Sequence, residues 1–335
     1  MPDTGKVDRE FFETQIEPKL GATRDDVALG PKHGVDFGVI TVEDTAVVTA
    51  TDPVSILPQL GFRRAGRFAV RIVLSDVAVS GLPPSHLSIA FTLPPSMTDG
   101  EFAQVWDAIH EECRDLGVSV VTGHTARYAG CSYPWVGGAT AMAVGDPGGI
   151  VRPDGARPGD DLIVTRGPAV ESAGLLSSLF PEAVDVDPST LATVQSGLDD
   201  LDAVRDAATA AAAGRVTAMH DVTEGGLVGA LHEVAESGGV RLAVDTDAVP
   251  IQSSVLAVCE ALGMDPWRAT SAGTLLIAVA PGDTDDVVEA LRERDTPVGV
   301  AGRVEAGSGV VLDGEETPAP EGDASWPVYE RLLGK

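Results

Sequence analysis

Apolar residues in the first half of the chain recur in blocks that predict several strands and one long helix. Residues 98–116 give the clearest helical pattern, because Thr98 and Glu101 form a capping box and apolar residues follow at helical spacing. The buried stripe of this helix would consist of Phe102, Val105, Trp106, Ile109, Cys113 and Leu116. Apolar β-type runs indicate strands at residues 47–53, 68–74, 87–93, 118–121 and 140–144.

Strands and helices alternate regularly in the second half. Strands are expected at 161–165, from 216 to the turn at Asp221, at 275–280 and at 298–304, with helices at 167–176, 190–213 and 283–293. A further helix follows the Asp221 turn, with Leu227, Leu231 and Val234 facing the core. This alternation is typical of a layered α/β domain. The tail after Leu312 is rich in Pro and acidic residues, and we expect it to pack loosely.

A stretch dense in Gly and Pro, residues 145–159, separates the two halves and indicates a domain boundary. The length of 335 residues is sufficient for two domains. We therefore expect an N-terminal domain over residues 1–148, a linker over 149–160 and a C-terminal domain over 161–335.

Charge and composition restrict the partners. The net charge of −28 would repel both a nucleic-acid backbone and an anionic membrane, so neither is expected as a partner. Only four of the 23 basic residues are lysines, and an acidic, lysine-poor surface suggests a high-salt cytoplasm in which ions screen the self-repulsion. No run of 18 apolar residues and no secretory leader are visible, which favours a cytoplasmic location. Cys113, Cys131 and Cys259 are isolated and fit neither a disulfide framework nor zinc spacing.

Acidic and polar residues follow several of the expected strands. Asp36, Asp52 and Asp76, the turn Gly123-His124-Thr125, and Asp221 all occupy such junctions. Carboxylates brought together repel unless a divalent cation holds them, and Mg²⁺ typically binds one or two carboxylates together with phosphate oxygens and water. The glycine-rich segment 29–38 and the helix that begins near Thr223 could supply backbone N–H groups to phosphates. Together these features predict an Mg–nucleotide site, although each aspartate could instead only cap a helix or turn.

Other nucleotide and hydrolase signatures are missing from the sequence. It contains no G-x-x-x-x-G-K-[ST] loop, no G-x-S-x-G elbow and no H-E-x-x-H zinc motif. A P-loop enzyme, a serine hydrolase of the elbow type and a zincin protease are therefore disfavoured.

Four blocks of the sequence resemble the signatures of the ATP-binding superfamily related to aminoimidazole ribonucleotide (AIR) synthetase. They are Ser75-Asp-Val-Ala-Val-Ser-Gly-Leu-Pro-Pro84, Gly123-His-Thr125, Met219-His-Asp-Val-Thr-Glu-Gly-Gly226 and Ser271-Ala-Gly-Thr-Leu-Leu276. The likeness covers roughly residues 10–305 in collinear order and is greatest to archaeal HypE-like hydrogenase maturation factors. The superfamily also includes selenophosphate synthetase and thiamine-monophosphate kinase.

The resemblance implies a PurM-like two-domain α/β (α+β) fold, with an N-terminal ferredoxin-like half-barrel and a C-terminal layered α/β domain. It further implies a homodimer whose N-terminal strands pair into a barrel, with ATP between the domains and Mg²⁺ on aspartates. The residues carried over as metal ligands are Asp36, Asp52, Asp76 and Asp221. Those carried over as nucleotide-binding are Gly34, Asp52, Asp76, Gly123, His124, Thr125 and Asp221.

The chain also departs from its relatives. HypE proper ends in a tail with a terminal Cys that carries a carbamoyl group, whereas no Cys follows Cys259 here, which argues against that chemistry. Lys32 and His124 are the candidate catalytic residues, since Lys32 lies in the glycine-rich loop and His124 in the Gly123-His124-Thr125 turn, and both segments are expected to meet phosphate. We therefore expect ATP-dependent phosphoryl transfer to a small molecule or to a group on a partner maturation protein. The alternatives are a hydrogenase maturation factor proper and a nucleotide-binding regulatory or scaffold protein with little turnover.

Overall fold

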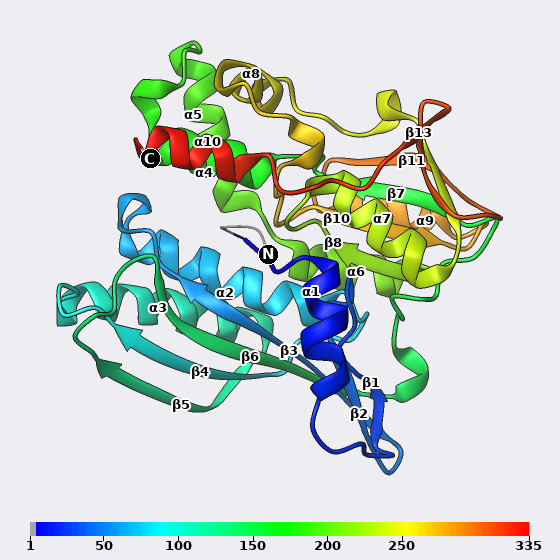
Figure 1. The fold of residues 1–335 in the computed structure, drawn as a ribbon, viewed down its shortest axis with the longest axis horizontal. Coiled ribbons are helices and arrows are strands. Elements are labelled where there is room, and N and C mark those ends of the chain that lie inside the picture. Colours follow the sequence, from blue (N-terminus) through cyan, green and yellow to red (C-terminus); the bar gives the residue numbers. More distant parts are fainter. Residues whose placement is uncertain (1–4, 335) are drawn as a thin grey trace. The chain divides into compact units, whose positions relative to one another are not determined.

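Two β-sheets form the centres of two units in the computed structural model, which describes residues 5–334 (Figure 1). One unit, called here the N-terminal unit, comprises residues 25–30 and 36–150. The other, the C-terminal unit, comprises the described residues up to Arg24, residues 31–35 and everything described from Val151 onward. The first residues of the chain and part of the glycine-rich loop therefore group with the second half of the sequence.

The sheet of the N-terminal unit has six strands in the order β1-β2-β3-β6-β4-β5. Neighbouring strands are antiparallel except β4 and β5, which are parallel. The strands are β1 (Val27–Leu29), β2 (Gly38–Val42), β3 (Thr45–Ser55), β4 (His86–Leu93), β5 (Ser119–Arg127) and β6 (Trp135–Gly145).

Helices α2 (Phe62–Ala78) and α3 (Asp99–Leu116) pack on one face of this sheet (Figure 1). The capping box of α3 is confirmed, because Thr98 and Glu101 each bond the other's backbone N–H. The strand predicted over residues 68–74 is wrong, since that run lies within α2. It reads as continuously apolar because α2 contacts α3, β3 and β6 and so buries residues on most of its circumference.

The two-residue alternation of β3 assigns its side chains to the two faces of the sheet. Ala46, Val48 and Val54 are buried on the face that α2 covers. Val47 lies on the other face, in register with Ile40 of β2 and Val144 of β6. Ile40 and Val144 are 37% and 46% exposed, so this face presents apolar side chains to solvent in the isolated chain.

The sheet of the C-terminal unit has seven strands in the order β13-β12-β9-β11-β7-β10-β8. Only β9 and β12 pair in parallel. The strands are β7 (Asp161–Thr165), β8 (Val216–Asp221), β9 (Arg241–Val244), β10 (Leu275–Val279), β11 (Val298–Glu305), β12 (Gly309–Leu312) and β13 (Glu315–Thr317).

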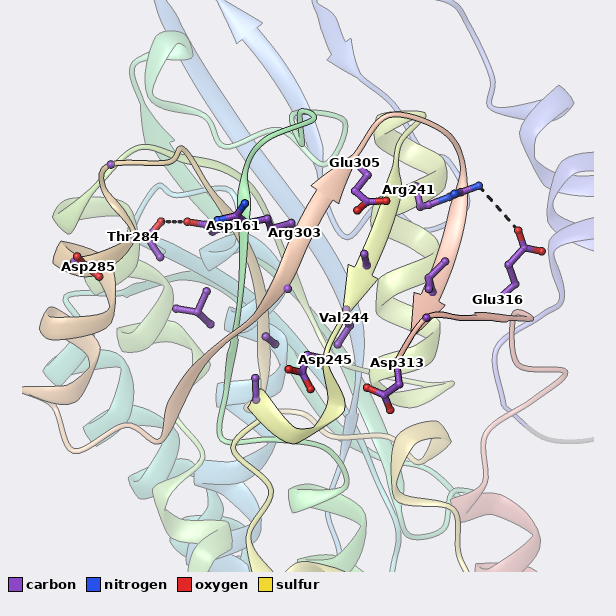
Figure 2. Close-up of a pocket in the computed structure, with 18 residues that line it drawn as sticks. Asp161, Arg241, Val244, Asp245, Thr284, Asp285, Arg303, Glu305, Asp313 and Glu316 are labelled. Carbon is purple, nitrogen blue, oxygen red and sulfur yellow. Dashed lines mark hydrogen bonds and ion pairs between the residues drawn. The ribbon is translucent and has the colours of Figure 1, made fainter.

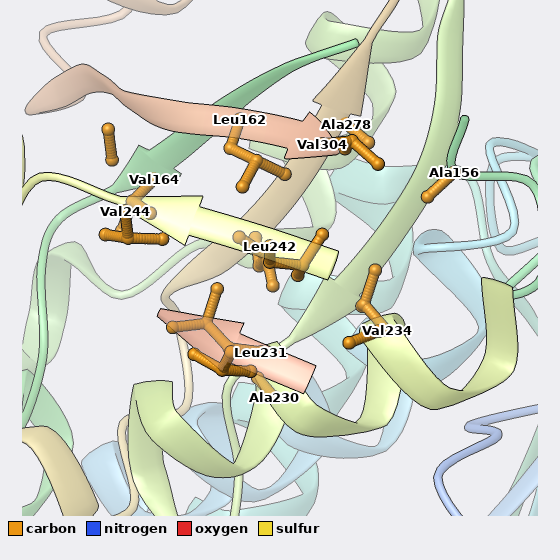
Figure 3. Close-up of a cluster of buried hydrophobic side chains, with 14 of the residues drawn as sticks. Ala156, Leu162, Val164, Ala230, Leu231, Val234, Leu242, Val244, Ala278 and Val304 are labelled. Carbon is orange, nitrogen blue, oxygen red and sulfur yellow. The ribbon is translucent and has the colours of Figure 1, made fainter. Parts of the chain in front are cut away.

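Helix α7 (Gly226–Gly238) covers one face of this sheet and forms its main core (Figure 3). Leu227, Leu231 and Val234 are buried as predicted, and they pack against strand residues such as Leu162 and Leu242. Helices α6 (Ala203–Ala213) and α9 (Thr284–Arg292) contact each other and the sheet. The layered α/β arrangement expected for this half is confirmed.

The remaining helical segments of the C-terminal unit bring two corrections. The helix predicted over residues 190–213 is two helices, because the segment Leu198–Asp200 forms a 3₁₀ turn and Asp202 then caps the next helix through Arg205 N–H. The tail after Leu312 is not loosely packed, since it forms β13 and α10. The segments are α1 (Arg9–Phe11), followed by π- and 3₁₀-turns to Lys19, and α4 (Val170–Leu179), α5 (Pro188–Gly197), α8 (Ser253–Leu262) and α10 (Ser325–Leu332).

Among residues 5–334, no helix combines the length and the apolar character needed to cross a membrane.

Candidate functional site

Strand β8 delivers two buried polar residues, His220 and Asp221, to the start of a turn. Asp221 is the last residue of β8 and lies opposite Leu275 of β10, as the sequence predicted for a strand end. Both side chains are at most 2% exposed. His220 Nδ1 lies 2.6 Å from the carbonyl oxygen of Asp221, and His220 Nε2 lies 3.0 Å from Glu233 Oε2 on α7. A histidine between a backbone carbonyl and a carboxylate is held in one ring orientation.

The turn after Asp221 requires glycine at two successive positions. Gly225 and Gly226 have φ values of +85° and +64°, in the left-handed region that side chains disfavour. A Cβ atom on Gly226 would lie 2.6 Å from the carbonyl oxygen of Trp267. Helix α7 begins directly at Gly226 and has no side-chain cap at its N-terminus. The turn therefore presents the positive end of a thirteen-residue helix beside a buried carboxylate.

The glycine-rich loop packs against α7 within the C-terminal unit. Gly34 has a φ of +71°, and a Cβ atom there would lie 2.9 Å from Glu233 Cγ, so the loop needs glycine to approach this helix. Burial would raise the pKa of Glu233, but the hydrogen bond from His220 and the charges of Lys6 and His33 hold the pKa below its usual value. The carboxylate of Glu233 is thus kept ionised under this loop.

The Ser271–Thr274 block has a structural role at this turn. Val222 N–H donates to the carbonyl of Thr274, and Ser271 N–H donates back to the carbonyl of Val222. The hydroxyls of Ser271 and Thr274 both donate to the carbonyl of Gly167, in the loop between β7 and α4. The block therefore joins the turn after Asp221 to the loop that precedes α4.

Glu171, in the first turn of α4, adds a second buried carboxylate. It accepts hydrogen bonds from Ala272 N–H at 2.7 Å and from the Thr270 hydroxyl at 3.1 Å. Burial raises the pKa of Glu171 to about 7, against the lowering effect of these two bonds, and the charges of Asp323 and Asp221 raise it further. Glu171 therefore titrates near neutral pH, unlike an ordinary surface glutamate.

Lys6 and Lys32 lie in N-terminal segments that belong to the C-terminal unit. Lys6 donates its backbone N–H to Glu224 and its ammonium group to the Thr223 hydroxyl, at 2.7 and 3.1 Å. Lys32, a candidate catalytic residue, is exposed in the loop and acts electrostatically on Asp154.

The predicted site residues of the N-terminal unit are not all at strand ends. Asp52 lies inside β3, because this strand continues to Ser55, and it shares the face of Val48 that α2 covers. Asp76 lies inside α2, so its assignment to a strand end is wrong, because the apolar run that precedes it is helical. Asp36 lies in the loop before β2, beside the buried Phe37. All three carboxylates are half-buried.

The segment Gly123-His124-Thr125 is likewise no turn, because it lies in the middle of β5. Gly123 faces Ile89 of β4 so closely that a Cβ atom would lie 2.6 Å from the Ile89 carbonyl oxygen. His124 is exposed and stacks on Tyr128, with its Nε2 atom 3.1 Å from the phenol oxygen. Because β5 is an edge strand of the sheet, one side of its backbone has no partner strand within the described chain.

A large hollow lies on the sheet of the C-terminal unit (Figure 2). Its volume is about 1150 Å³, and its floor comes from residues of β9, β11 and β12 such as Ala243 and Val300. The acidic groups around it are partly neutralised, since Asp161 pairs with Arg303 at 3.3 Å and accepts from Thr284 at 2.8 Å. No residue predicted from the sequence to bind nucleotide or metal lines it.

Sequence reasoning missed Glu171, Glu233 and Asp323. Glu171 is a single acidic residue among apolar helix positions, which could have indicated an unusual environment. Glu233 directly precedes Val234, the last residue of the predicted apolar stripe, and looks like an ordinary surface glutamate. Asp323 lies in the acidic tail, where nothing in the sequence separates it from its neighbours.

Two family models cover most of the chain. The AIR synthase related protein N-terminal domain matches residues 34–145, and the corresponding C-terminal domain matches residues 157–315. The chain belongs to the AIR synthase related protein family. The resemblance stated from the four sequence blocks is thereby confirmed.

Relatives of this family member include proteins named for hydrogenase maturation. A carbamoyl dehydratase HypE of Azotobacter vinelandii is 31% identical over 73% of this chain and 71% of its own length. A putative hydrogenase expression/formation protein of Methanocaldococcus jannaschii is 27% identical over 86% and 84% of the two chains.

Solved structures share the fold of this family member. Escherichia coli HypE superposes with a TM-score of 0.72 at 26% identity, covering 84% of this chain and 88% of that one. A HypE in complex with ATP gives 0.69 at 23% identity over 93% and 91%, and a HypE–HypF complex gives 0.66 at 20% over 84% and 93%. The PurM-like two-domain α/β fold expected from the resemblance is thus confirmed.

Proposed function

We propose that this chain binds Mg–ATP and transfers a phosphoryl group to a small molecule or to a group carried by a partner protein, as a HypE-like family member. The family membership and the relatives named HypE support this assignment. One protein of the same fold was solved in complex with ATP, and another was solved with HypF. The proposal therefore includes a partner protein as a possible carrier of the group that accepts the phosphoryl group.

The main support for this proposal is the structure of the turn at residues 221–226. A buried carboxylate, two left-handed glycines and the uncapped start of α7 occur together there. Helix N-termini bind phosphate through backbone N–H groups and the helix dipole. A carboxylate beside them repels a bare phosphate but suits one that carries Mg²⁺, so the donor set fits the metal complex better than the free anion.

We propose the following roles for the other residues of the site. Asp36, Asp52 and Asp76 are proposed Mg²⁺ ligands of the N-terminal unit, with Asp221 as the ligand from the C-terminal unit. Gly34, Gly123, His124 and Thr125 are proposed to contact nucleotide. Lys32 and His124 are the proposed groups that contact the transferred phosphoryl oxygens or hold a proton.

The chemistry asked of these residues is mainly electrostatic. Phosphoryl transfer requires positioning and charge neutralisation more than covalent help from the protein. Mg²⁺, when bound, supplies most of that neutralisation. The turn would orient the phosphates through fixed N–H groups, which need no rearrangement during the reaction.

The test is titration calorimetry with Mg–ATP, together with phosphate or ADP release in the presence of candidate acceptors. The Asp221→Asn and Asp76→Asn variants should lose most of the binding and turnover. Asp285→Asn, an exposed aspartate in the first turn of α9, is the matched control and should retain both. Tight binding without any product would favour the regulatory or scaffold alternative. Absence of any heat with Mg–ATP in the wild type would refute the proposal.

We also propose that the chain forms a homodimer through the N-terminal sheet. The open face presents Ile40, Val47 and Val144 in register across three strands, and Trp135 at the start of β6 is 53% exposed. Val121 on the edge strand β5 is equally exposed. Apolar side chains next to an unpaired strand edge favour pairing with another chain.

A further inference from the structure

The turn that carries the proposed function is held in place by a distant part of the chain. Gly225 N–H donates a hydrogen bond to Asp323 Oδ2 at 2.9 Å, across 98 residues of sequence. Pro320 packs on the same glycine, because a Cβ atom on Gly225 would lie 3.1 Å from Pro320 Cγ. The segment from Pro320 to Leu332, called here the C-terminal strap, therefore rests directly on the turn.

Asp323 uses its two carboxylate oxygens for different purposes. Oδ2 accepts from Gly225, whereas Oδ1 accepts the backbone N–H of Ser325 at 2.7 Å and the Ser325 hydroxyl at the start of α10. The side chain is 9% exposed, so water competes little for these bonds. One carboxylate thus joins the first turn of α10 to the turn before α7.

The strap is itself bonded to the rest of the unit at several points, so it can restrict the movement of the turn. Ala324 N–H donates to the carbonyl of Arg268, in the segment whose Trp267 packs on Gly226.

At the other end of α10, Arg331 donates to the carbonyl of Leu262, and the centres of the Tyr329 and Phe180 rings lie 5.9 Å apart. An element fixed at both ends limits the movement of whatever it bonds in between.

The turn needs such support because of its composition. Two adjacent glycines lose more backbone freedom on ordering than any other pair of residues, so a turn built from them is easily disordered. The backbone contacts around Gly226 fix one glycine, and Asp323 is the side chain that fixes the other. The N-terminal side of the unit adds the two bonds from Lys6 to Thr223 and Glu224.

From these contacts we infer that Asp323 is a positioning residue for the nucleotide site, and that the C-terminal strap keeps the 221–226 turn in its phosphate-binding form. This inference rests on the proposed function. Asp323 acts through Gly225 and need not touch the nucleotide itself.

The experiment compares three full-length variants with the wild type. Asp323→Ala removes the acceptor, Asp323→Asn keeps one acceptor oxygen for Gly225, and Glu321→Ala removes an exposed acid from the same segment as a control. Hydrogen exchange followed by mass spectrometry is measured on the peptide spanning residues 222–228, with α9 as the internal reference. Mg–ATP affinity is measured by calorimetry on the same samples.

We expect Asp323→Ala to accelerate exchange at residues 222–228 without changing α9, and to weaken Mg–ATP binding about tenfold or more. Asp323→Asn should recover much of both, and Glu321→Ala should match the wild type. Unchanged exchange or unchanged affinity in Asp323→Ala would overturn the inference. If Asp323→Ala does not fold, Asp323→Asn decides, because an amide keeps only one of the two acceptor oxygens and should fall measurably short of the wild type. Faster exchange at residues 222–228 together with weaker Mg–ATP binding in Asp323→Asn would support the inference, and wild-type values of both would overturn it.

The two proposals fail in different ways. A wild-type chain that binds no Mg–ATP removes the proposed function, and the exchange measurement alone then decides whether Asp323 holds the turn. If the wild type binds Mg–ATP and Asp323→Ala binds it equally well, the proposed function stands and only the role of the C-terminal strap is refuted.

Discussion

The imidazole of His220 and the carboxylate of Glu233 approach to 3.0 Å between β8 and α7. His220 is fully buried and its other ring nitrogen faces the Asp221 carbonyl, so Glu233 is the carboxylate that secures the ring. The pair connects the end of the strand that carries Asp221 to the helix against which the glycine-rich loop packs. It therefore connects β8 and α7 at the point where α7 contacts a loop nearly 200 residues earlier in the sequence.

Replacing Glu233 by Gln should destabilise the protein at neutral pH by about 1.5–3 kcal/mol, as expected for a hydrogen bond to a charged group. The pKa of Glu233 is lowered in the folded state, so its stabilising effect is present above the usual value of 4.5 and is lost as the pH falls through the lower folded value. Denaturant unfolding at pH 7 and below pH 4 measures both parts. Glu236→Gln on the same helix is the control, because its partly exposed ion pair with Arg9 should contribute less than about 1 kcal/mol.

Glu171 should show the opposite dependence on pH. Its folded pKa of about 7 lies above the ordinary value of 4.5, so stability is greatest when it is protonated and is lost as the pH rises through 7. The shift corresponds to about 3 kcal/mol at most. In Glu171→Gln, the loss of unfolding free energy between pH 5 and pH 8.5 should be smaller than in the wild type by up to this amount. An identical pH profile in the two proteins would contradict the burial of an ionisable group here.

Local patterns in the sequence predicted those elements whose environment is simple. The capping box at Thr98 and Glu101 predicted the start of α3 correctly, because both partners lie three residues apart and need no tertiary information. The stripe of Leu227, Leu231 and Val234 was equally clear, since these large apolar residues recur at helical spacing and all three are buried in the core. The end of β8 at Asp221 followed from the glycines beside it.

Tertiary packing determined what the sequence could not predict. Residues 68–74 form a helix because neighbours on several sides bury them, and a short apolar run has the same appearance in a buried strand. Asp76 was misplaced for that reason, and Asp52 because β3 is longer than its apolar run. The contact between Gly225 and Asp323 spans 98 residues, so no local pattern could have indicated it.

Gly226→Ala should destabilise the protein far more than Gly239→Ala, although both glycines have φ values near +60°. Both substitutions carry the left-handed strain of about 1–2 kcal/mol. Only at Gly226 would the new methyl group collide with backbone atoms of Trp267 and Ala269, whereas nothing lies within 4 Å at Gly239. Unfolding free energies should differ by about 2 kcal/mol or more between the two variants, since buried backbone cannot move aside cheaply. Equal values would show that the turn adapts, and would weaken its assignment as a fixed phosphate-binding element.

The proposed dimer should depend on the open face of the N-terminal sheet and on salt. Sedimentation of the wild type should give twice the 34.5 kDa of one chain, whereas Val144→Lys should sediment as a single chain because it places a charge among apolar side chains. Leu256→Lys, which changes a similarly exposed residue on α8, is the control and should remain dimeric. Each chain carries a net charge of −28, so association at low ionic strength works against strong repulsion that salt screens. The dimer dissociation constant of the wild type should therefore fall as salt rises from about 0.1 M to 1 M, where the Debye length is only about 3 Å. A monomer at every salt concentration would remove the dimer from the proposal.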